Sequence, residues 1–332
     1  MKHTQQLLTD TLGRQWIEIA AENPELVDSF RPCLVAFVGF DRGSKPGLAG
    51  TGFLIAGGAN LGLVITAKHV LAEGVLNIQR PVPRHSPSAL FISASSLIPD
   101  IRKEKLRCLW LDSTHGEAFV VPHVSYNDIL DIACCVLVPQ EVTSAPFTFP
   151  RAIPLDTARP SIGDVVHMVS LDGMELLDYA PFDPASGPRP FSVYRRTSIR
   201  VGVVTATYPQ GFRQYKWPCF TTSIPAEPGM SGGFVYFPRE GYAIAACGIV
   251  CADNSSPEAR LNQLVCGESV IAYSWPALAL NLPEQLSENA PSYTLHDMMR
   301  KGTVPMAIGG IDHIEISNRE LNGDCTIEYK VC

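Results

Sequence analysis

The sequence has no apolar run of about eighteen residues, and its N-terminus has no apolar segment of the signal-peptide type. We therefore expect neither a membrane span nor a secretory leader. A basic cluster is also missing, because the densest stretch, Arg102 to Arg107, contains a glutamate. With a net charge of −7 and a pI of about 5.6, the 332-residue chain is not expected to bind nucleic acid or an anionic membrane.

The ten cysteines include no C-x-x-C pair of the kind typical of zinc sites, so no metal or other cofactor is expected. Their placement does not indicate a disulfide framework either. Cys134 and Cys135 are adjacent in an apolar run, where they must point to opposite faces of a strand, and Cys247 and Cys251 lie in similar sequence. This pattern predicts buried free thiols in a reducing compartment and a cytoplasmic location.

The rest of the composition is that of an ordinary globular protein, with 46% hydrophobic and 18% charged residues. From about Pro32 onward, short runs rich in Val, Ile, Leu and Phe alternate with Gly, Pro, Ser and Asp. Such spacing predicts antiparallel barrels or sandwiches, not alternating strands and helices. A proline-rich stretch at residues 150–164 divides the series in two.

Three segments differ from this pattern. The stretch from Gln5 to Phe30 has nearly helical apolar spacing and predicts a helix, which Pro24 ends or restarts. Between Leu171 and Ile199 the sequence is polar and rich in proline, which predicts a long functional or mobile loop. Near the C-terminus, an Asn-Gly pair between two strand-like runs predicts a β-hairpin.

The stretch "EPGMSGGFVYF", from Glu227 to Phe237, contains a serine among glycines. Alone, it fits either a nucleophile on a rigid loop or a glycine-rich turn that leads into a strand. A serine hydroxyl becomes a good nucleophile only when a neighbouring base removes its proton. The backbone N–H groups of Gly229 and Ser231 could stabilise a developing oxyanion, because glycine permits the turn that aligns them.

A base and an acid are present earlier in the chain. His69 follows the apolar strand in "LVITAKHVL", although a lone histidine is more often structural. Asp131 precedes the apolar run in "NDILDIACCVLV", where a buried carboxylate needs a hydrogen-bond or ionic partner. Asp128, three residues earlier, is the alternative acid.

These stretches together resemble the chymotrypsin-like (trypsin-fold) serine peptidases. The segments "TAKH", "DIACCVLV" and "GMSGG" are similar to the family's histidine, aspartate and serine motifs, and "CGIVCADN" is similar to the strand that lines its substrate cleft. His69, Asp131 and Ser231 also follow the family's order. The resemblance covers roughly Cys33 to Leu280.

The resemblance implies an all-β fold of two packed antiparallel six-stranded β-barrels. The first barrel, with the histidine and aspartate, would occupy residues 32–150, and the second, with the serine, residues 151–283. A short N-terminal helical segment would occupy residues 1–31, and a C-terminal extension with the hairpin residues 284–332.

The resemblance also implies a mechanism for cleaving a protein or peptide substrate. His69 would act as general base and then general acid, Asp131 would orient it, and Ser231 would form an acyl-enzyme. The oxyanion hole would consist of the Gly229 and Ser231 amides. The substrate would bind as an added antiparallel strand along Val250, Cys251, Ala252 and Asp253.

The sequence departs from secreted trypsins at Met230, where trypsins carry an aspartate that receives a freed N-terminus. Methionine cannot form that ion pair, so activation by N-terminal clipping is not expected. In this respect the chain is more similar to HtrA-like and bacterial trypsin-like peptidases, although the tail after Glu284 is too short for a PDZ domain. Pro225 or Ala226 lies near the specificity pocket, so an acidic floor is not expected there.

Three functions compete at this point. An endopeptidase is favoured over a catalytically silent protein-binding module, because a binder has no need of a base, its orienting acid and a nucleophile. An esterase is disfavoured, because the histidine precedes the serine and β-like sequence follows it. The N-terminal segment, the 171–199 insertion and the C-terminal extension either dock a regulatory protein or cover barrel edges, and the insertion is a candidate gate.

Overall fold

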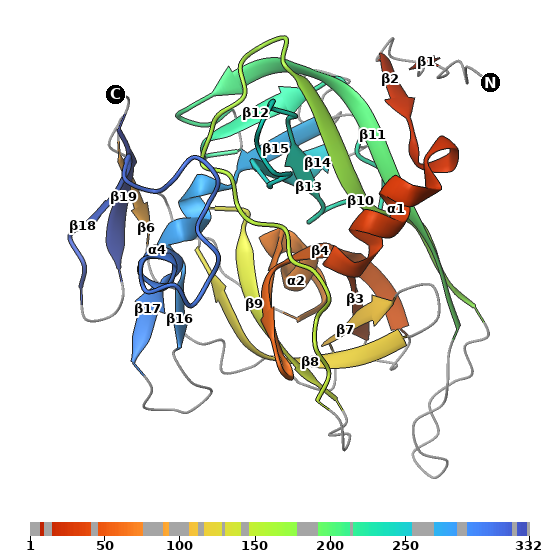
Figure 1. Ribbon diagram of the computed structural model, residues 1–332, viewed down its shortest axis with the longest axis horizontal. Coiled ribbons are helices and arrows are strands. Elements are labelled where there is room, and N and C mark those ends of the chain that lie inside the picture. Colours follow the sequence, from red (N-terminus) through yellow and green to blue (C-terminus); the bar gives the residue numbers. More distant parts are fainter. Residues whose placement is uncertain are drawn as a thin grey trace.

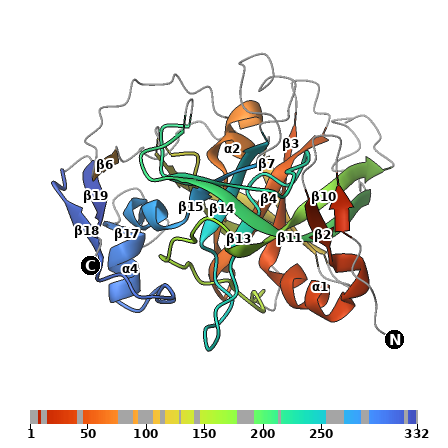
Figure 2. The same ribbon diagram turned by 90° about the horizontal axis from the view of Figure 1, so that it is seen from above.

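The structure is a computed structural model, in which most residues form antiparallel strands and the helices are short (Figure 1). Strand β2 (Gln15–Glu18) and the C-terminal strands β18 (Ile314–Ser317) and β19 (Cys325–Tyr329) lie on opposite sides of the molecule in two perpendicular views (Figures 1 and 2). The structure describes residues 7–9, 15–40, 46–75, 89–92, 106–111, 116–127, 130–140, 146–177, 192–212, 215–253, 269–283, 291–320 and 324–330.

The first barrel is a closed ring of six antiparallel strands in the order β3-β4-β5-β9-β8-β7. Strand β7 illustrates the pattern that forms it, because Leu106, Cys108 and Trp110 are buried and alternate with partly exposed residues. Helix α2 (Lys68–Val75) follows β5. The strands are β3 (Leu34–Phe40), β4 (Pro46–Gly58), β5 (Leu61–Thr66), β7 (Leu106–Leu111), β8 (Gly116–Tyr126) and β9 (Ala133–Pro139).

The second barrel also has six antiparallel strands, in the order β11-β10-β13-β14-β15-β12. It closes where β12 pairs back onto β11, from Val204↔Thr222 to Tyr208↔Cys219. The predicted pair of antiparallel six-stranded barrels is therefore confirmed. The strands are β10 (Val165–Leu177), β11 (Ser192–Tyr208), β12 (Cys219–Thr222), β13 (Phe234–Tyr236), β14 (Gly248–Asp253) and β15 (Ser269–Tyr273).

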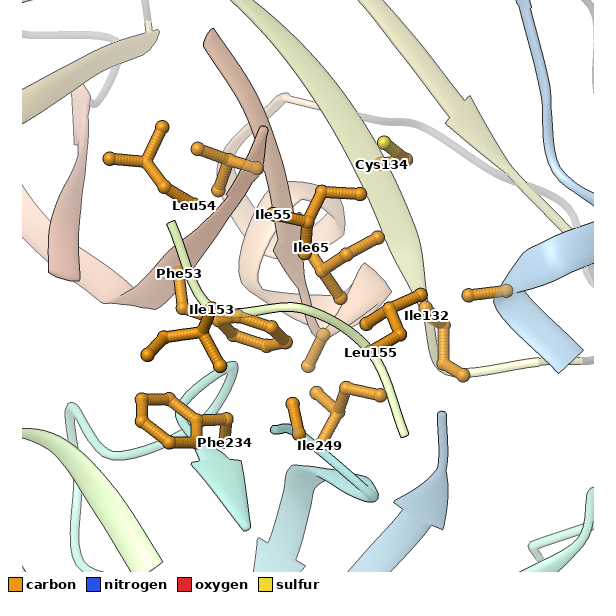
Figure 3. Packing of buried hydrophobic residues seen from close by; sticks show 14 of the residues in the cluster. Phe53, Leu54, Ile55, Ile65, Ile132, Cys134, Ile153, Leu155, Phe234 and Ile249 are labelled. Carbon is orange, nitrogen blue, oxygen red and sulfur yellow. The ribbon is translucent and has the colours of Figure 1, made fainter. Parts of the chain in front are cut away.

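A continuous apolar core joins the two barrels. The rings of Phe53 on β4 and Phe234 on β13 lie 5.2 Å apart between centroids. The connection between the barrels runs through this contact, where Ile153 and Leu155 are buried (Figure 3). The amide of Ile153 also donates to the carbonyl of Leu54 at 2.7 Å. Since burying one such side chain contributes about 2 kcal/mol, this shared core holds the barrels firmly together.

The N-terminal segment contains an α-helix, but it is shorter than predicted. Helix α1 (Pro24–Phe30) begins at the proline, and the side chain of Asn23 caps it by accepting a hydrogen bond from Leu26 N. Pro24 therefore starts the helix and does not end one. Short 3₁₀ turns lie on either side, η1 (Ala20–Glu22) and η2 (Arg31–Cys33).

The prediction of a helix from Gln5 was wrong for residues 7–9 and 15–18, and residues 5, 6 and 10–14 lie outside the described residues. The first two ranges form strands β1 (Leu7–Thr9) and β2 (Gln15–Glu18), which pair with each other. Strand β2 also pairs with β11 through Arg200↔Glu18 and Val201↔Ile17. The apolar spacing favours a helix here, but pairing with β11 favours a strand, and strand formation depends strongly on tertiary context.

The two described ends of the expected loop between Leu171 and Ile199 are strand. Strands β10 and β11 continue past the barrel and pair as far as Leu177↔Ser192. The centre of the insertion, residues 178–191, lies outside the described residues, and with it the predicted gate.

The C-terminal extension packs beside the barrels and contains the predicted hairpin. Strands β18 (Ile314–Ser317) and β19 (Cys325–Tyr329) pair antiparallel, and β19 also pairs with β6 (Ala89–Ile92). An early segment and the end of the chain thus share one sheet. The remaining elements are η3 (Trp275–Ala279), β16 (Asn281–Pro283), β17 (Ser292–Thr294) and α4 (Leu295–Arg300).

Eight of the ten cysteines lie in the described part of the chain, and all eight are buried with free thiols. Burial raises the pKa of Cys33 to about 12, although the charge of Arg151 opposes the shift. Among the described residues, no helix has the length and apolar character needed to cross a membrane.

Candidate active site

His69 lies where the chain leaves strand β5 and begins helix α2. Strand β5 is buried from Gly62 to Thr66, and the hydroxyl of Thr66 donates to the carbonyl of Thr51 on β4 at 2.6 Å. This bond fixes the end of the strand just before the histidine. The side chain of His69 is 35% exposed, so the ring is open to solvent while its backbone is anchored.

Asp131 holds His69 through both of its carboxylate oxygens. Its Oδ1 accepts a hydrogen bond from the backbone N–H of His69 at 2.9 Å, and its Oδ2 lies 2.7 Å from Nδ1 of the ring. Burial alone would raise the pKa of Asp131. The charge and hydrogen bonds of His69, with a smaller contribution from Lys68, outweigh burial and lower the pKa below 3.8. Asp131 is therefore ionised near neutral pH.

The ionised carboxylate determines the tautomer of His69. Because it can only accept hydrogen bonds, Nδ1 of the ring must carry the proton in the contact with Oδ2 of Asp131. In the neutral ring, Nε2 then carries no proton and has a lone pair that can accept one. Nε2 is thus the atom of His69 that can take a proton from a nucleophile.

Residues Glu227 to Met230 form a tight turn directly before Ser231. The amide of Met230 donates to the carbonyl of Glu227 at 3.0 Å, Pro228 stands second, and Gly229 stands third with φ of 94°. These features characterise a type II turn, whose third residue needs positive φ. The side chain of Met230 is fully buried, and its sulfur accepts from the amide of Glu227 at 3.2 Å.

The backbone amides of Gly229 and Ser231 are the two in this loop without a protein acceptor. Within the described part of the chain, the neighbouring amides of Met230, Gly232 and Gly233 all donate to backbone carbonyls, whereas these two do not. Both remain available for a negatively charged oxygen. The loop thus has the donors that an oxyanion hole requires.

Thr51 of the first barrel fixes this loop of the second barrel. Its amide donates to the carbonyl of Ser231 at 2.8 Å, and its hydroxyl donates to the carbonyl of Gly229 at 2.7 Å. The same hydroxyl accepts from the amide of Leu171 on β10 at 3.1 Å. Thr51 is fully buried, so water does not compete for these bonds.

The loop that carries Ser231, residues 225–233 and here called the serine loop, packs against the residues on both sides of His69. A Cβ placed on Gly232 would lie 3.1 Å from the amide of Ala67, and one placed on Gly50 would lie 2.6 Å from Val70 and 2.8 Å from the carbonyl of Ser231. The structure therefore brings together the stretches that carry His69, Asp131 and Ser231, although they lie far apart in the sequence.

The sequence matches the family of trypsin-like peptidase domains over residues 50–245, which is more than half of the chain. The chain belongs to the trypsin-like peptidase family. Among solved structures it is similar to GrC, with a TM-score of 0.39 and 15% identity over 73% of this chain and 89% of that one. It is also similar to the scabies mite inactivated protease paralogue S-I1, with a TM-score of 0.41 and 14% identity over the same shares. None of the curated proteins compared with the chain matches it.

In this trypsin-like peptidase, strand β14 contains the four residues expected to bind substrate. Val250 differs from the others, because its amide donates to Gly233 and its carbonyl accepts from Gly232. Its backbone therefore supports the serine loop and is not free to pair with a peptide. Cys251 is buried, and its thiol donates to the backbone carbonyl of Asp131 at 3.6 Å.

Among the four residues expected to bind substrate, those at 251–253 lie beyond the backbone bonds between Val250 and the serine loop. Ala252 and Asp253 pair with Val270 and Ser269 of β15, and a bulge interrupts the register between Val250 and Ala252. The alternative acid, Asp128, lies outside the described residues. Thr51 is a functional residue that sequence reasoning missed, because its only local signal was its place between two glycines.

Gly232 has φ of 85° and no space for a side chain. Its Cβ would lie 2.0 Å from the backbone oxygen of Thr51. Gly232→Ala should lower the free energy of unfolding of the peptidase by about 3 kcal/mol or more, measured by urea denaturation. Gly241→Ala is the matched control, since Gly241 has φ of 77° in open space and should cost only about 1 kcal/mol. Equal losses would contradict the close packing of the serine loop.

Proposed function

We propose that the protein is a serine endopeptidase that hydrolyses peptide bonds through a Ser231–His69–Asp131 triad. The observation that carries the proposal is that both carboxylate oxygens of Asp131 bind His69, Oδ1 at 2.9 Å from its backbone N and Oδ2 at 2.7 Å from its Nδ1. A carboxylate with a purely structural role has no need to fix the tautomer of a histidine. A histidine that acts as general base does need its tautomer fixed, because its Nε2 must stay unprotonated.

The proposed reaction begins when Ser231 Oγ attacks the carbonyl carbon of the scissile bond while Nε2 of His69 takes the hydroxyl proton. Negative charge then develops on the carbonyl oxygen, which the amides of Gly229 and Ser231 stabilise. His69 returns the proton to the leaving amine, and an acyl-enzyme on Ser231 remains. Water, activated by His69, hydrolyses the acyl-enzyme and restores the free serine.

The proposed substrate is an extended segment of a protein or peptide that pairs with the backbone of residues 251–253. Such pairing holds the main chain of a substrate through hydrogen bonds that do not depend on its sequence. We also propose a reducing, cytoplasmic compartment, which is supported by eight buried free thiols.

The proposal is tested by reaction with a fluorophosphonate probe, which modifies serines that an adjacent base activates. We expect one covalent adduct, and peptide mapping by mass spectrometry should locate it on Ser231. Ser29→Ala is a control, since the hydroxyl of Ser29 bonds to Leu26 O within helix α1 and its loss should leave labelling unchanged. An unlabelled protein, or a label on another serine, would contradict the proposed nucleophile.

A further inference from the structure

Five charged side chains cluster beside the turn that precedes Ser231: Glu18, Asp172, Arg196, Arg200 and Glu227. They come from the N-terminal strand β2, from the barrel strands β10 and β11, and from the turn itself. Asp172 is fully buried, and the side chain of Arg200 is only 4% exposed. Burying charged groups is costly unless each has partners, so such a cluster requires close mutual positioning.

Arg200 is the centre of this cluster and contacts three separate segments. Its Nε donates to Glu18 on β2 at 3.2 Å, and its Nη2 donates to Asp172 on β10 at 3.2 Å. The other contacts reach the serine loop, where Nη2 pairs with Glu227 at 2.9 Å and Nη1 donates to the carbonyl of Pro225 at 2.9 Å. A planar guanidinium can make these bonds at once because its donors point in fixed directions.

Glu18 orients Arg200 and is itself held tightly. Its Oε1 accepts from the amides of Ala20 and Ile199 at 3.2 and 3.0 Å. Its Oε2 accepts from the hydroxyl of Ser198 at 2.8 Å as well as from Arg200. Glu18 and Arg200 also face each other as a cross-strand pair of β2 and β11. The docking of the N-terminal strand therefore determines where the guanidinium points.

The turn at Glu227–Met230 needs an external restraint. A type II turn and a type I turn have the same hydrogen bond between their ends and differ in the orientation of the central peptide, here between Pro228 and Gly229. Glycine accepts either sign of φ at little cost, so Gly229 does not itself select the form with φ of 94°. Rotating this peptide would turn the Gly229 N–H away from the position of an oxyanion.

We propose that Arg200, oriented by Glu18 of the N-terminal strand, is a positioning residue that holds the Glu227–Met230 turn in the form that presents the Gly229 amide to the reacting carbonyl. This inference rests on the proposed function, since it names what keeps the proposed oxyanion hole formed. Met230 cannot serve as an ionic anchor for the loop. Arg200 instead anchors the start of the loop, because it pairs with the side chain of Glu227, the first residue of the turn, and donates to the carbonyl of Pro225 just before it.

The test compares kcat and KM on a peptide ester for four variants, together with their unfolding temperatures. Arg200→Met should lower kcat by about 10²-fold, because one oxyanion donor is lost from most molecules, while KM stays within about threefold. Arg200→Lys should recover part of this loss. Glu18→Gln keeps an acceptor for the two backbone amides but loses its charge, so it should lower kcat by about tenfold.

Arg196→Met is the matched control. Arg196 pairs with Asp172 through two bonds of 2.7 Å and belongs to the same cluster. Although the charge of Glu227 acts on it, Arg196 makes no hydrogen bond or ion pair with the serine loop within the described part of the chain. Its removal should change the unfolding temperature without changing kcat by more than about twofold. An equal loss of kcat in Arg196→Met would reduce Arg200 to a general stabilising role and overturn the inference.

The outcomes separate this inference from the proposed function. A wild-type protein that neither cleaves the ester nor reacts with a fluorophosphonate would overturn both. A wild-type protein that does both, with unchanged kcat in Arg200→Met and Glu18→Gln, would overturn only the positioning role. Should Arg200→Met fail to fold, Glu18→Gln decides alone, because it retains the arginine and its other partners and removes only the charge that orients the guanidinium.

Discussion

Replacing Ser231 with alanine is expected to lower kcat by about 10⁶-fold, while the unfolding temperature changes by no more than about 2 °C. The hydroxyl is the proposed nucleophile, and the methyl group of alanine cannot form an acyl-enzyme. Among the described residues, the bond that holds Ser231 uses its backbone carbonyl, which accepts from the amide of Thr51, and not its Oγ. Steady-state hydrolysis of a peptide ester and thermal denaturation of the same preparation measure the two effects.

A Ser231→Ala variant that still cleaves at the wild-type rate would show that the nucleophile is another residue. Ser29→Ala provides the comparison, because it removes a hydroxyl from helix α1 and should leave kcat unchanged. A variant that loses activity together with its cooperative melting transition would indicate misfolding, and the fluorophosphonate adduct on the wild-type protein then decides the assignment.

Asp131→Asn should lower kcat by about 10⁴-fold near neutral pH. The carboxylate has two acceptor oxygens, and both are used by His69, one by its backbone N–H and one by Nδ1. Asparagine offers one acceptor and one donor, so one of these bonds must be lost. If the amide group faces Nδ1, it forces the proton onto Nε2, and His69 can no longer act as a base.

Asp128→Asn is the control for this prediction, because Asp128 is the other carboxylate that the sequence offered. It should leave kcat within about threefold of the wild type. The reverse result, with activity lost in Asp128→Asn and retained in Asp131→Asn, would reassign the acid. Fluorophosphonate labelling of Asp131→Asn should be correspondingly slow, since the reaction with Ser231 also depends on the base.

The three proposed catalytic residues could be predicted from sequence because each lies in a short, contiguous pattern. His69 ends a buried strand, Asp131 precedes one, and Ser231 lies among glycines that a tight turn requires. The alternation of apolar residues likewise predicted the strands of both barrels. For the strands and the turn the signal is local, since neighbouring residues determine which face is buried or which φ is needed. The three site residues stood out only together, because they follow the order of the family that they resemble.

The cluster around Arg200 could not be predicted in this way. Glu18, Asp172 and Glu227 lie far from Arg200 in the chain. The register of β2, β10 and β11 brings the first two beside it, and the turn before Ser231 brings the third. The same long-range pairing explains the failed helix prediction for strand β2. When the role of a residue depends on partners from several strands, the residues next to it in the sequence do not indicate that role.

Thr51 has a further consequence for when the protein becomes active. It lies in the first barrel, yet its bonds hold the carbonyls of Gly229 and Ser231 in the second. Under the proposed mechanism, a chain still on the ribosome with only its first barrel folded has His69 and Asp131 but no nucleophile and no oxyanion donors. Activity then begins only after the second barrel has been synthesised and has joined the first, so neighbouring nascent chains are protected from premature cleavage.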